Sequence, residues 1–199
     1  MTIHKIKKVS LILFADKGYN GASLSDIAAG VGIKKPSIYA HFSGKDDLYM
    51  AVFEEVFHLY IERMKDIKNE LTFEPLDKRL YLYLLRLSAF IAKHQAEMMM
   101  YKRAIVFPPE QLKEIVSNRH QQVKKLQDEI LEDIFLELCK AEIVDHKQQS
   151  ELITSFHCIL NGSIVQQLLD QNDNLEKRVN SIWKIYWNGL LSLKKTALH

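Results

Sequence analysis

The side chains best placed to contact another molecule lie between Ser23 and Lys45, in the run SLSDIAAGVGIKKPSIYAHFSGK. Ser23 and Asp26 have the three-residue spacing of a capping box, which starts a helix. Gly32 is expected to end that helix, because glycine takes the left-handed backbone of a helix stop without strain. Pro36, whose fixed φ suits a first turn, then starts a second helix that runs through Phe42. Two short helices joined at a glycine predict a helix-turn-helix, a motif that reads DNA.

The outward side of the second helix carries groups with the right chemistry for DNA. Ile38 and Phe42 are four residues apart and are expected to face inward. Ser37, Tyr39 and Ala40 therefore project from the other side. A hydroxyl can donate to or accept from base edges, and a methyl group or ring can contact the methyl of thymine. Lysine, hydroxyl and histidine groups can also hold phosphate.

Three helices are expected to position these groups. The first covers roughly Ile3–Lys17 and is stopped by Gly18. A small shared core is predicted from the apolar spacing, formed by Phe14, Ile27, Val31, Ile38 and Phe42. A long helix begins at Lys45 and runs to about Asn69. We refer to residues 1–45 as the predicted head and to residues 46–199 as the predicted body.

Charge is distributed unevenly along the chain. The net charge is only +2 over 199 residues. Residues 1–50 hold seven lysines, no arginine and four aspartates, whereas the remainder has 20 basic and 21 acidic residues. The positive excess therefore lies on the segment that contains the helix-turn-helix, where neutralisation of phosphates would require it. A solvated charged face is the alternative interpretation of these lysines.

An amphipathic helix followed by GYNGASLSDIAAGVGIKKPSIYAHFSGKDDLYMAVFEEV is similar to the amino-terminal domain of the TetR (tetracycline-repressor-like) family of bacterial transcriptional regulators. The family pattern, GY…TS…IA…GVSKGTLYYHF..KEEL, is nearly complete here and in register over about residues 4–56. Beyond that stretch, only the number and length of the helices match. The resemblance implies a ligand-responsive repressor that binds a palindromic operator as a homodimer and is released by a small, mostly apolar effector.

The family's DNA contacts can be carried over position by position. The residues that fall at such positions are Ser25, Lys34, Lys35, Pro36, Ser37, Tyr39, Ala40, His41 and Lys45. Two departures from the pattern matter. Lys34 replaces the usual Ser or Thr before the recognition helix, so that helix is expected to lack a side-chain cap. The first arginine of the chain is Arg63, so specificity is expected to depend on methyl contacts and DNA shape rather than on bidentate guanine recognition.

The predicted body consists of further helices, which makes the whole chain all-α: a three-helix DNA-binding head on a larger helical body for ligand binding and dimerisation. Their expected ranges are Leu76–His94, Ala96–Val106, Glu110–Ala141, Asp145–Gln171 and, after a break at Asn172–Asn174, a last helix from Leu175. Tyr, Phe and Met dominate their inner faces and favour a mostly apolar effector with few hydrogen-bonding groups. A fatty compound, an aromatic compound or a drug-like cation would fit equally well. The candidate effector residues are Tyr60, Met64, Tyr83, Phe90, Met99, Arg103, His157 and Asn161, for any of which ordinary core packing is the alternative.

The last two helices are apolar over more than one side. The alternatives are burial within one chain and, as the resemblance implies, a four-helix interface with a second copy. Paired heads would read a palindrome, which one helix-turn-helix cannot do. The candidate interface residues are Phe156, Leu160, Ile164, Leu168, Trp183, Tyr186, Trp187 and Leu190.

Other functions find less support in the sequence. No catalytic, metal or cofactor motif is recognisable, and His157 and Cys158 are helix neighbours whose side chains diverge by about 100°. We therefore expect no enzyme, no cofactor and no metal. An activator or an architectural DNA-binding protein without an inducer is the alternative function. Cys139 and Cys158 are expected to be buried, reduced thiols. Neither a signal peptide nor an apolar run approaching ~20 residues is recognisable, so we expect a cytoplasmic protein without a membrane partner.

Overall fold

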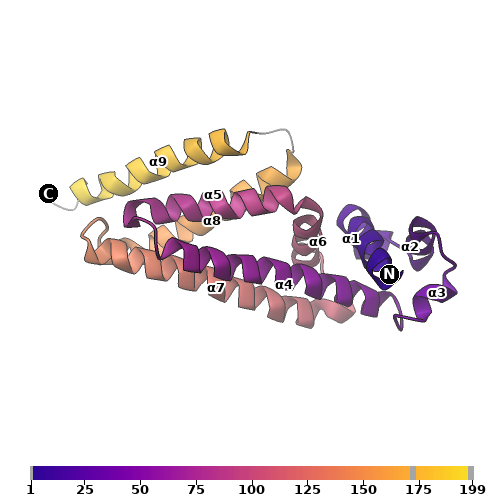
Figure 1. The fold of residues 1–199 in the computed structure, drawn as a ribbon. Helices are drawn as coiled ribbons and strands as arrows, with labels where there is room; N and C mark the ends of the chain where they lie inside the picture. The colour runs from indigo at the N-terminus through magenta and orange to yellow at the C-terminus, as the bar shows by residue number, and fades with distance from the viewer. Residues whose placement is uncertain (1, 171–173, 197–199) are drawn as a thin grey trace. The chain divides into compact units, whose positions relative to one another are not determined.

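The computed structural model describes residues 2–170 and 174–196, with side chains up to residue 193. The described residues form α-helices and two short 3-10 turns and contain no β-strand. The helices are α1 (Thr2–Gly21), α2 (Leu24–Val31), α3 (Pro36–Tyr39), α4 (Lys45–Leu71), α5 (Leu76–Lys93), α6 (Gln95–Val106), α7 (Lys113–Lys140), α8 (Gln149–Leu169) and α9 (Leu175–Thr196). The 3-10 turns, η1 (Glu110–Leu112) and η2 (His146–Gln148), precede α7 and α8. The all-α prediction is confirmed (Figure 1).

The chain divides into two compact units, each built from two segments of sequence. Unit 1 comprises residues 1–62 and 94–123, and unit 2 comprises residues 63–93 and 124–199. The boundaries fall inside α4 and α7, so each of these long helices contributes to both units. The division of the chain at residue 45 stays a prediction.

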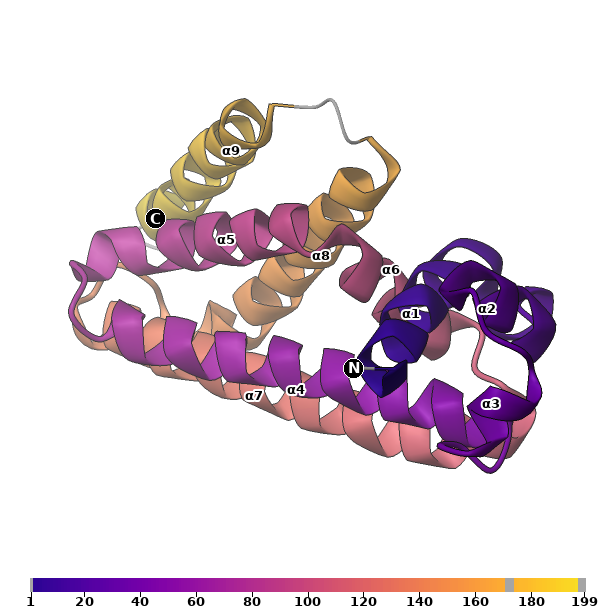
Figure 2. The same ribbon diagram turned by 45° about the vertical axis from the view of Figure 1, so that its right-hand side comes forward.

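Unit 1 contains α1–α3, the first part of α4, α6 and the start of α7. Helix α1 lies against α6 and α2 (Figure 2). Its buried residues include Phe14, which packs edge-on to Tyr49 of α4 at a ring-centroid distance of 4.9 Å. Gly18 has φ 69° within α1, so the regular helix is interrupted at the glycine that the sequence predicts. The start of α7 is joined to α4 by Arg119, whose Nε lies 2.9 Å from Glu54 Oε1.

Unit 2 contains the end of α4, α5, the rest of α7, α8 and α9. Helix α5 packs against both α8 and α9, and Figure 1 shows α9 running beside α5. Leu80, Leu84, Leu87 and Ile91 of α5 are buried, as their spacing of three to four residues predicts. The predicted break at Asn172–Asn174 and the predicted end of α8 at Gln171 lie largely outside the described residues, and α8 is described to Leu169.

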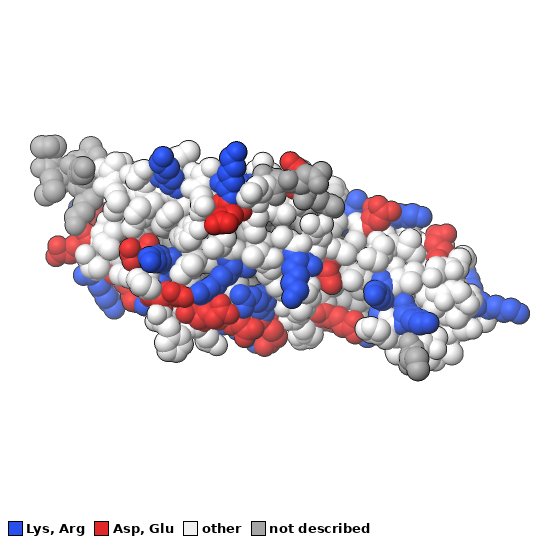
Figure 3. Space-filling model, turned by 45° about the horizontal axis from the view of Figure 1, so that its top comes forward, with Lys and Arg blue, Asp and Glu red and all other residues white. Residues whose placement is uncertain are grey.

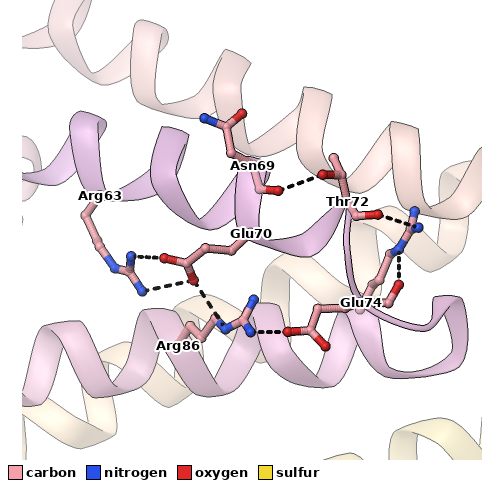
Figure 4. A network of polar contacts seen from close by, with 7 residues as sticks. Arg63, Asn69, Glu70, Thr72, Glu74 and Arg86 are labelled. Atoms are coloured by element: carbon pink, nitrogen blue, oxygen red, sulfur yellow. Dashed lines mark hydrogen bonds and ion pairs between the residues drawn. The ribbon is translucent and has the colours of Figure 1, made fainter.

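A network of ion pairs joins the end of α4 to α5 in unit 2 (Figure 4). Arg63 Nη1 lies 2.6 Å from Glu70 Oε1, and Arg86 Nε lies 3.3 Å from Glu70 Oε2. Arg86 also pairs with Glu74 through its Nη2 atom. These side chains are partly exposed, so each pair contributes little by itself. Glu70 and Arg86 each hold two partners, so the network links the end of α4, the turn after it and α5.

Helix α8 requires a correction to the sequence analysis. The stretch His146–Leu169 is long and apolar enough to cross a membrane by length and composition, with a mean hydropathy of 1.2 over its best window. Core helices of other proteins pass the same test. Here α8 packs on α5, and its buried Gln167 accepts a hydrogen bond from Arg178 of α9. These contacts identify α8 as a core helix of unit 2.

The two cysteines differ in their surroundings. Cys139 is buried, as predicted, and burial raises the pKa of its thiol. The prediction for Cys158 is wrong, because this residue lies on the exposed side of α8. Apolar sequence neighbours placed it in the core, but those neighbours occupy other faces of the same helix.

Candidate DNA-binding site

The first helix of the motif starts at a complete capping box. Ser23 Oγ accepts a hydrogen bond from the Asp26 backbone N–H at 3.1 Å, and Asp26 Oδ2 accepts one from the Ser23 backbone N–H at the same distance. Bonding to Ser23 lowers the pKa of the Asp26 carboxyl. The predicted cap is therefore confirmed, and it places α2 with Leu24, Ile27 and Ala28 turned into the core of unit 1.

The turn between the two helices depends on Gly32. Its backbone is left-handed, with φ 79° and ψ 32°, and its N–H bonds to the carbonyls of Ala28 and Ala29. The N–H of Ile33 also reaches the Ala28 carbonyl at 3.0 Å. This double closure satisfies the carbonyls left free at the end of α2. The predicted glycine stop is confirmed.

Helix α3 is shorter than the sequence predicts. It covers Pro36–Tyr39, whereas we expected it to run through Phe42. The His41 N–H bonds to the Ile38 carbonyl at 2.9 Å, which is the tighter three-residue pattern of a final turn. The helix also lacks a side-chain cap, as expected, although the cap position is Lys35 rather than Lys34. Ile38 and Phe42 are both buried, so the predicted inner face is confirmed.

The remaining predicted contact residues form an exposed surface around α3. Tyr39 is 52% exposed, whereas Ile38 beside it is fully buried. Basic side chains project from the surface of unit 1 around α2 and α3 (Figure 3). The exposed residues of this surface are Ser25, Lys34, Lys35, Pro36, Ser37, Tyr39, Ala40 and His41. Their contact with DNA stays a prediction. The contact requires these side chains to be exposed, as they are.

Lys45 differs from the other predicted contacts because it is half-buried. Its Nζ atom lies 4.1 Å from the centroid of the Tyr19 ring, within the range of a cation–π contact. Burial lowers the pKa of the Lys45 ammonium. The Tyr19 hydroxyl donates a hydrogen bond to Asp46 Oδ1, and Gln111 Nε2 donates to the Tyr19 oxygen at 2.9 Å.

This cluster around Lys45 is not predicted by the sequence patterns described above. Neither Tyr19 nor Asp46 is among the contact residues predicted from the sequence. Burial and the bond to Asp46 raise the pKa of Tyr19 to about 12, so the phenol stays protonated and remains a donor. The only local signal in the sequence is the position of an aromatic residue between two glycines, next to a predicted helix stop.

The predicted effector residues are divided between the two units. Tyr60, Met99 and Arg103 belong to unit 1, and the other five belong to unit 2. Arg103 and Asn161 were expected to be polar groups on the inner faces of the helices. This expectation is wrong, because both side chains are exposed. His157 Nε2 lies 2.8 Å from Asp128 Oδ1, so this nitrogen already has a partner on α7. Tyr60, Met64, Tyr83 and Phe90 are buried, and their contact with an effector stays a prediction.

Five of the predicted interface residues are buried within a single chain. They are Phe156, Leu160, Ile164, Leu168 and Leu190. Side chains already covered by their own unit cannot also be covered by a second copy in this conformation, so the structure assigns these five to the core.

Trp183, Tyr186 and Trp187 are half-buried, and the two indole rings stack at a centroid distance of 5.0 Å. The most exposed large apolar side chains that the structure describes on α8 and α9 are instead Val165, Leu169 and Ile185, which are 46%, 77% and 77% exposed.

A capped helix, a left-handed glycine turn and a short exposed helix on an all-α scaffold define a helix-turn-helix protein. The model of the bacterial regulatory proteins of the tetR family matches residues 6–52. This match covers the helix-turn-helix segment and the start of α4, so residues 6–52 are similar to the amino-terminal domain of the TetR family.

Among curated relatives, the chain is similar to IcaR of Staphylococcus epidermidis, a negative regulator of the biofilm operon icaADBC. The two are 40% identical over 58 residues, which is 29% of this chain and 31% of the relative. The match thus spans about a third of that relative.

Solved structures of similar fold cover almost the whole chain. FadR of Bacillus subtilis, solved in complex with stearoyl-CoA, has a TM-score of 0.69 and 18% identity, and covers 94% of this chain and 98% of its own. AibR, solved with isovaleryl coenzyme A and operator DNA, has a TM-score of 0.68 and 16% identity, and covers 92% and 96%. At these identities the similarity establishes a shared fold.

Proposed function

We propose that this protein is a ligand-responsive transcriptional repressor that binds a palindromic operator as a homodimer in the cytoplasm. The observation that carries the proposal is the surface around α3. Tyr39 is 52% exposed while Ile38 and Phe42 fix the same short segment in the core. A helix held so firmly on one side, with hydroxyl, ring and methyl groups on the other, is suited to entry into the major groove.

The individual contacts divide by chemistry. Ser37, Tyr39 and Ala40 face the base edges, with a hydroxyl for hydrogen bonds and apolar groups for thymine methyls. Lys34, Lys35, His41 and Lys45 hold phosphates, and Ser25 and Pro36 approach the backbone from α2 and from the start of α3. Phosphate contacts set the register of the protein on the duplex, and base contacts supply the sequence preference.

Dimerisation follows from the size of the motif. One helix of four residues reads only a few base pairs, whereas two heads one helical turn apart read a palindrome. The exposed apolar side chains Val165, Leu169 and Ile185 on α8 and α9 are the surface we propose for the contact between copies. Trp183 and Trp187, which are half-buried, would complete it.

The proposed effector is a mostly apolar small molecule. The buried aromatic and methionine side chains of unit 2, among them Met64 and Tyr83, favour such a ligand. FadR and AibR were solved with acyl-CoA thioesters. Stearoyl-CoA and isovaleryl-CoA are therefore the first probes to test. To weaken DNA binding 100-fold, an effector must prefer the released conformation by about 2.7 kcal/mol.

The decisive experiment is selection of random duplex DNA by the purified protein, followed by sequencing. We expect an enriched motif with two inverted half-sites. Enrichment of a single half-site would contradict the dimeric reading, and salt-sensitive binding without any motif would contradict sequence-specific regulation. Transcription in vitro from a promoter that carries the motif then distinguishes repression from activation.

Tyr39→Ala tests the reading surface directly, with Phe73→Ala as the matched control. Both rings are exposed, by 52% and 90%, so neither truncation should affect folding. Tyr39→Ala should weaken binding to the selected motif, whereas Phe73→Ala should not. Unchanged affinity of the Tyr39 variant in a fluorescence anisotropy titration would remove this ring from the interface.

A further inference from the structure

Gln111 is the middle residue of the turn η1. This turn directly follows Pro108 and Pro109 and precedes α7. Its side-chain amide reaches two distant parts of the chain within unit 1. The Nε2 atom donates to the Tyr19 hydroxyl oxygen at 2.9 Å and lies 3.2 Å from both carboxylate oxygens of Asp46. Tyr19 belongs to the end of α1 and Asp46 to the first turn of α4, so one amide group joins three elements.

The Tyr19 ring is held from several directions. Its hydroxyl group both donates to Asp46 and accepts from Gln111. The ring of Tyr49 meets it edge-on, at a centroid distance of 5.2 Å and an interplanar angle of 90°. The Lys45 ammonium lies 4.1 Å from the Tyr19 ring centroid. The orientation of this ring therefore determines where the Lys45 ammonium can lie.

This arrangement constrains a side chain that would otherwise be mobile. A lysine has four flexible bonds, and a phosphate contact requires its ammonium to be held in one place. The ring supplies a surface for the ammonium, and the amide and the carboxylate keep the ring from turning. Loss of the amide would leave the bond between Tyr19 and Asp46 intact, but would release both from the segment between α6 and α7.

We infer that Gln111 is a positioning residue for DNA binding, which fixes Lys45 through Tyr19 and Asp46 in the orientation that meets a phosphate. This inference rests on the proposed function. It also gives the segment between α6 and α7 a direct influence on DNA affinity, since any displacement of η1 would break the amide bonds to Tyr19 and Asp46.

The test compares Gln111→Ala with Gln121→Ala, which removes an exposed glutamine from α7 in the same unit. Affinity for the selected motif is measured by anisotropy between 50 and 200 mM salt, a range of about fourfold over which phosphate contacts dominate the change. Gln111→Ala should lower affinity about threefold to tenfold and reduce the slope of log K against log salt by about one. Gln121→Ala should match the wild type in both.

The double variant of Gln111→Ala with Lys45→Ala separates positioning from a general structural effect. If Gln111 acts through Lys45, the double variant should bind no more weakly than Lys45→Ala alone, because the second change removes a constraint on a group already absent. Additive losses would overturn the inference. Tyr19→Phe, which keeps the ring but removes the hydroxyl, should reproduce the reduced salt slope, and an unchanged slope would also overturn it.

The outcomes distinguish this inference from the proposed function. A wild type that selects a motif, together with a Gln111→Ala variant of equal affinity and equal salt slope, overturns the inference alone. A wild type that selects no motif overturns both. Thermal unfolding followed by circular dichroism should give the same midpoint for Gln111→Ala as for Gln121→Ala, and a lower midpoint for Gln111→Ala would assign the amide to folding instead.

Discussion

Replacing Gly32 by alanine should destabilise the helix-turn-helix although it removes no contact. The residue has φ 79°, in the left-handed region, and a Cβ atom built there would meet nothing within 4 Å. Crowding by neighbours is therefore excluded as a cause, and the cost is that of the backbone conformation alone. For an L-residue this conformation costs about 1–2 kcal/mol.

A smaller gain opposes this cost. Alanine restricts the unfolded chain more than glycine does, and this restriction stabilises a folded protein by about 0.4–1 kcal/mol where the native backbone is compatible. Taking the middle of each range, the net loss for Gly32→Ala should thus be about 0.8 kcal/mol. Gly32→Asn should cost less, because the short polar side chain of asparagine tolerates the left-handed region.

Urea denaturation followed by circular dichroism measures the free energy of unfolding, and hydrogen exchange at the amides of α2 and α3 reports the local effect. The expected order of stability is wild type, then Gly32→Asn, then Gly32→Ala. If Gly32→Ala were as stable as the asparagine variant or more stable than the wild type, backbone strain could not be the reason for the glycine.

Two further predictions concern stability and assembly. Burial raises the pKa of Tyr49 to about 12. An unfolded tyrosine ionises near pH 10, so the contribution of Tyr49 to the free energy of unfolding is fully present below that pH and is lost as the pH rises to about 12. The free energy of unfolding falls by at most about 1.4 kcal/mol per pH unit for this one group. Measured by urea denaturation, the free energy of unfolding of Tyr49→Phe should decline less steeply with pH over this range than that of the wild type. Equal slopes for the two proteins would contradict the raised pKa of Tyr49. Ile185→Glu places a charge on a side chain that is 77% exposed, so the variant should fold but sediment as a monomer in analytical ultracentrifugation. A dimer of unchanged stability would place the interface elsewhere.

Local patterns in the sequence predict the motif well, because the interactions that form it are local. The capping box joins Ser23 to Asp26, three residues apart, and the glycine stop joins Gly32 to carbonyls three and four residues earlier. Helical periodicity likewise places α5 and α6 within a residue or two, because each has one apolar face. Such features need no knowledge of which helix packs against which.

The parts that sequence reasoning missed depend on partners far away along the chain. Gln111 is 92 residues from Tyr19, and nothing in either local pattern indicates that the two side chains meet. Helix α8 shows the same limit of what local sequence patterns can predict. It is apolar on several sides, so periodicity could not decide which side packs on α5 and which stays exposed. The candidate interface residues therefore included Phe156 and Leu160, which are buried in the core, and left out Val165 and Leu169, which are exposed.

The absence of arginine from residues 1–62 has a consequence for how the proposed operator is recognised. Arginine makes the commonest specific contact, a bidentate pair with guanine, and a lysine reaches the same atoms without the rigid fork. The exposed groups on and directly after α3 include a hydroxyl, a ring and a methyl, and the ring and the methyl suit thymine methyls. We therefore expect α3 to distinguish A·T pairs from other base pairs. The lysines should add affinity for DNA that decreases as the salt concentration rises. Positioning of Lys45 by Tyr19 and Gln111 then matters more, because register on the DNA has to come from phosphate contacts when few base contacts can impose it.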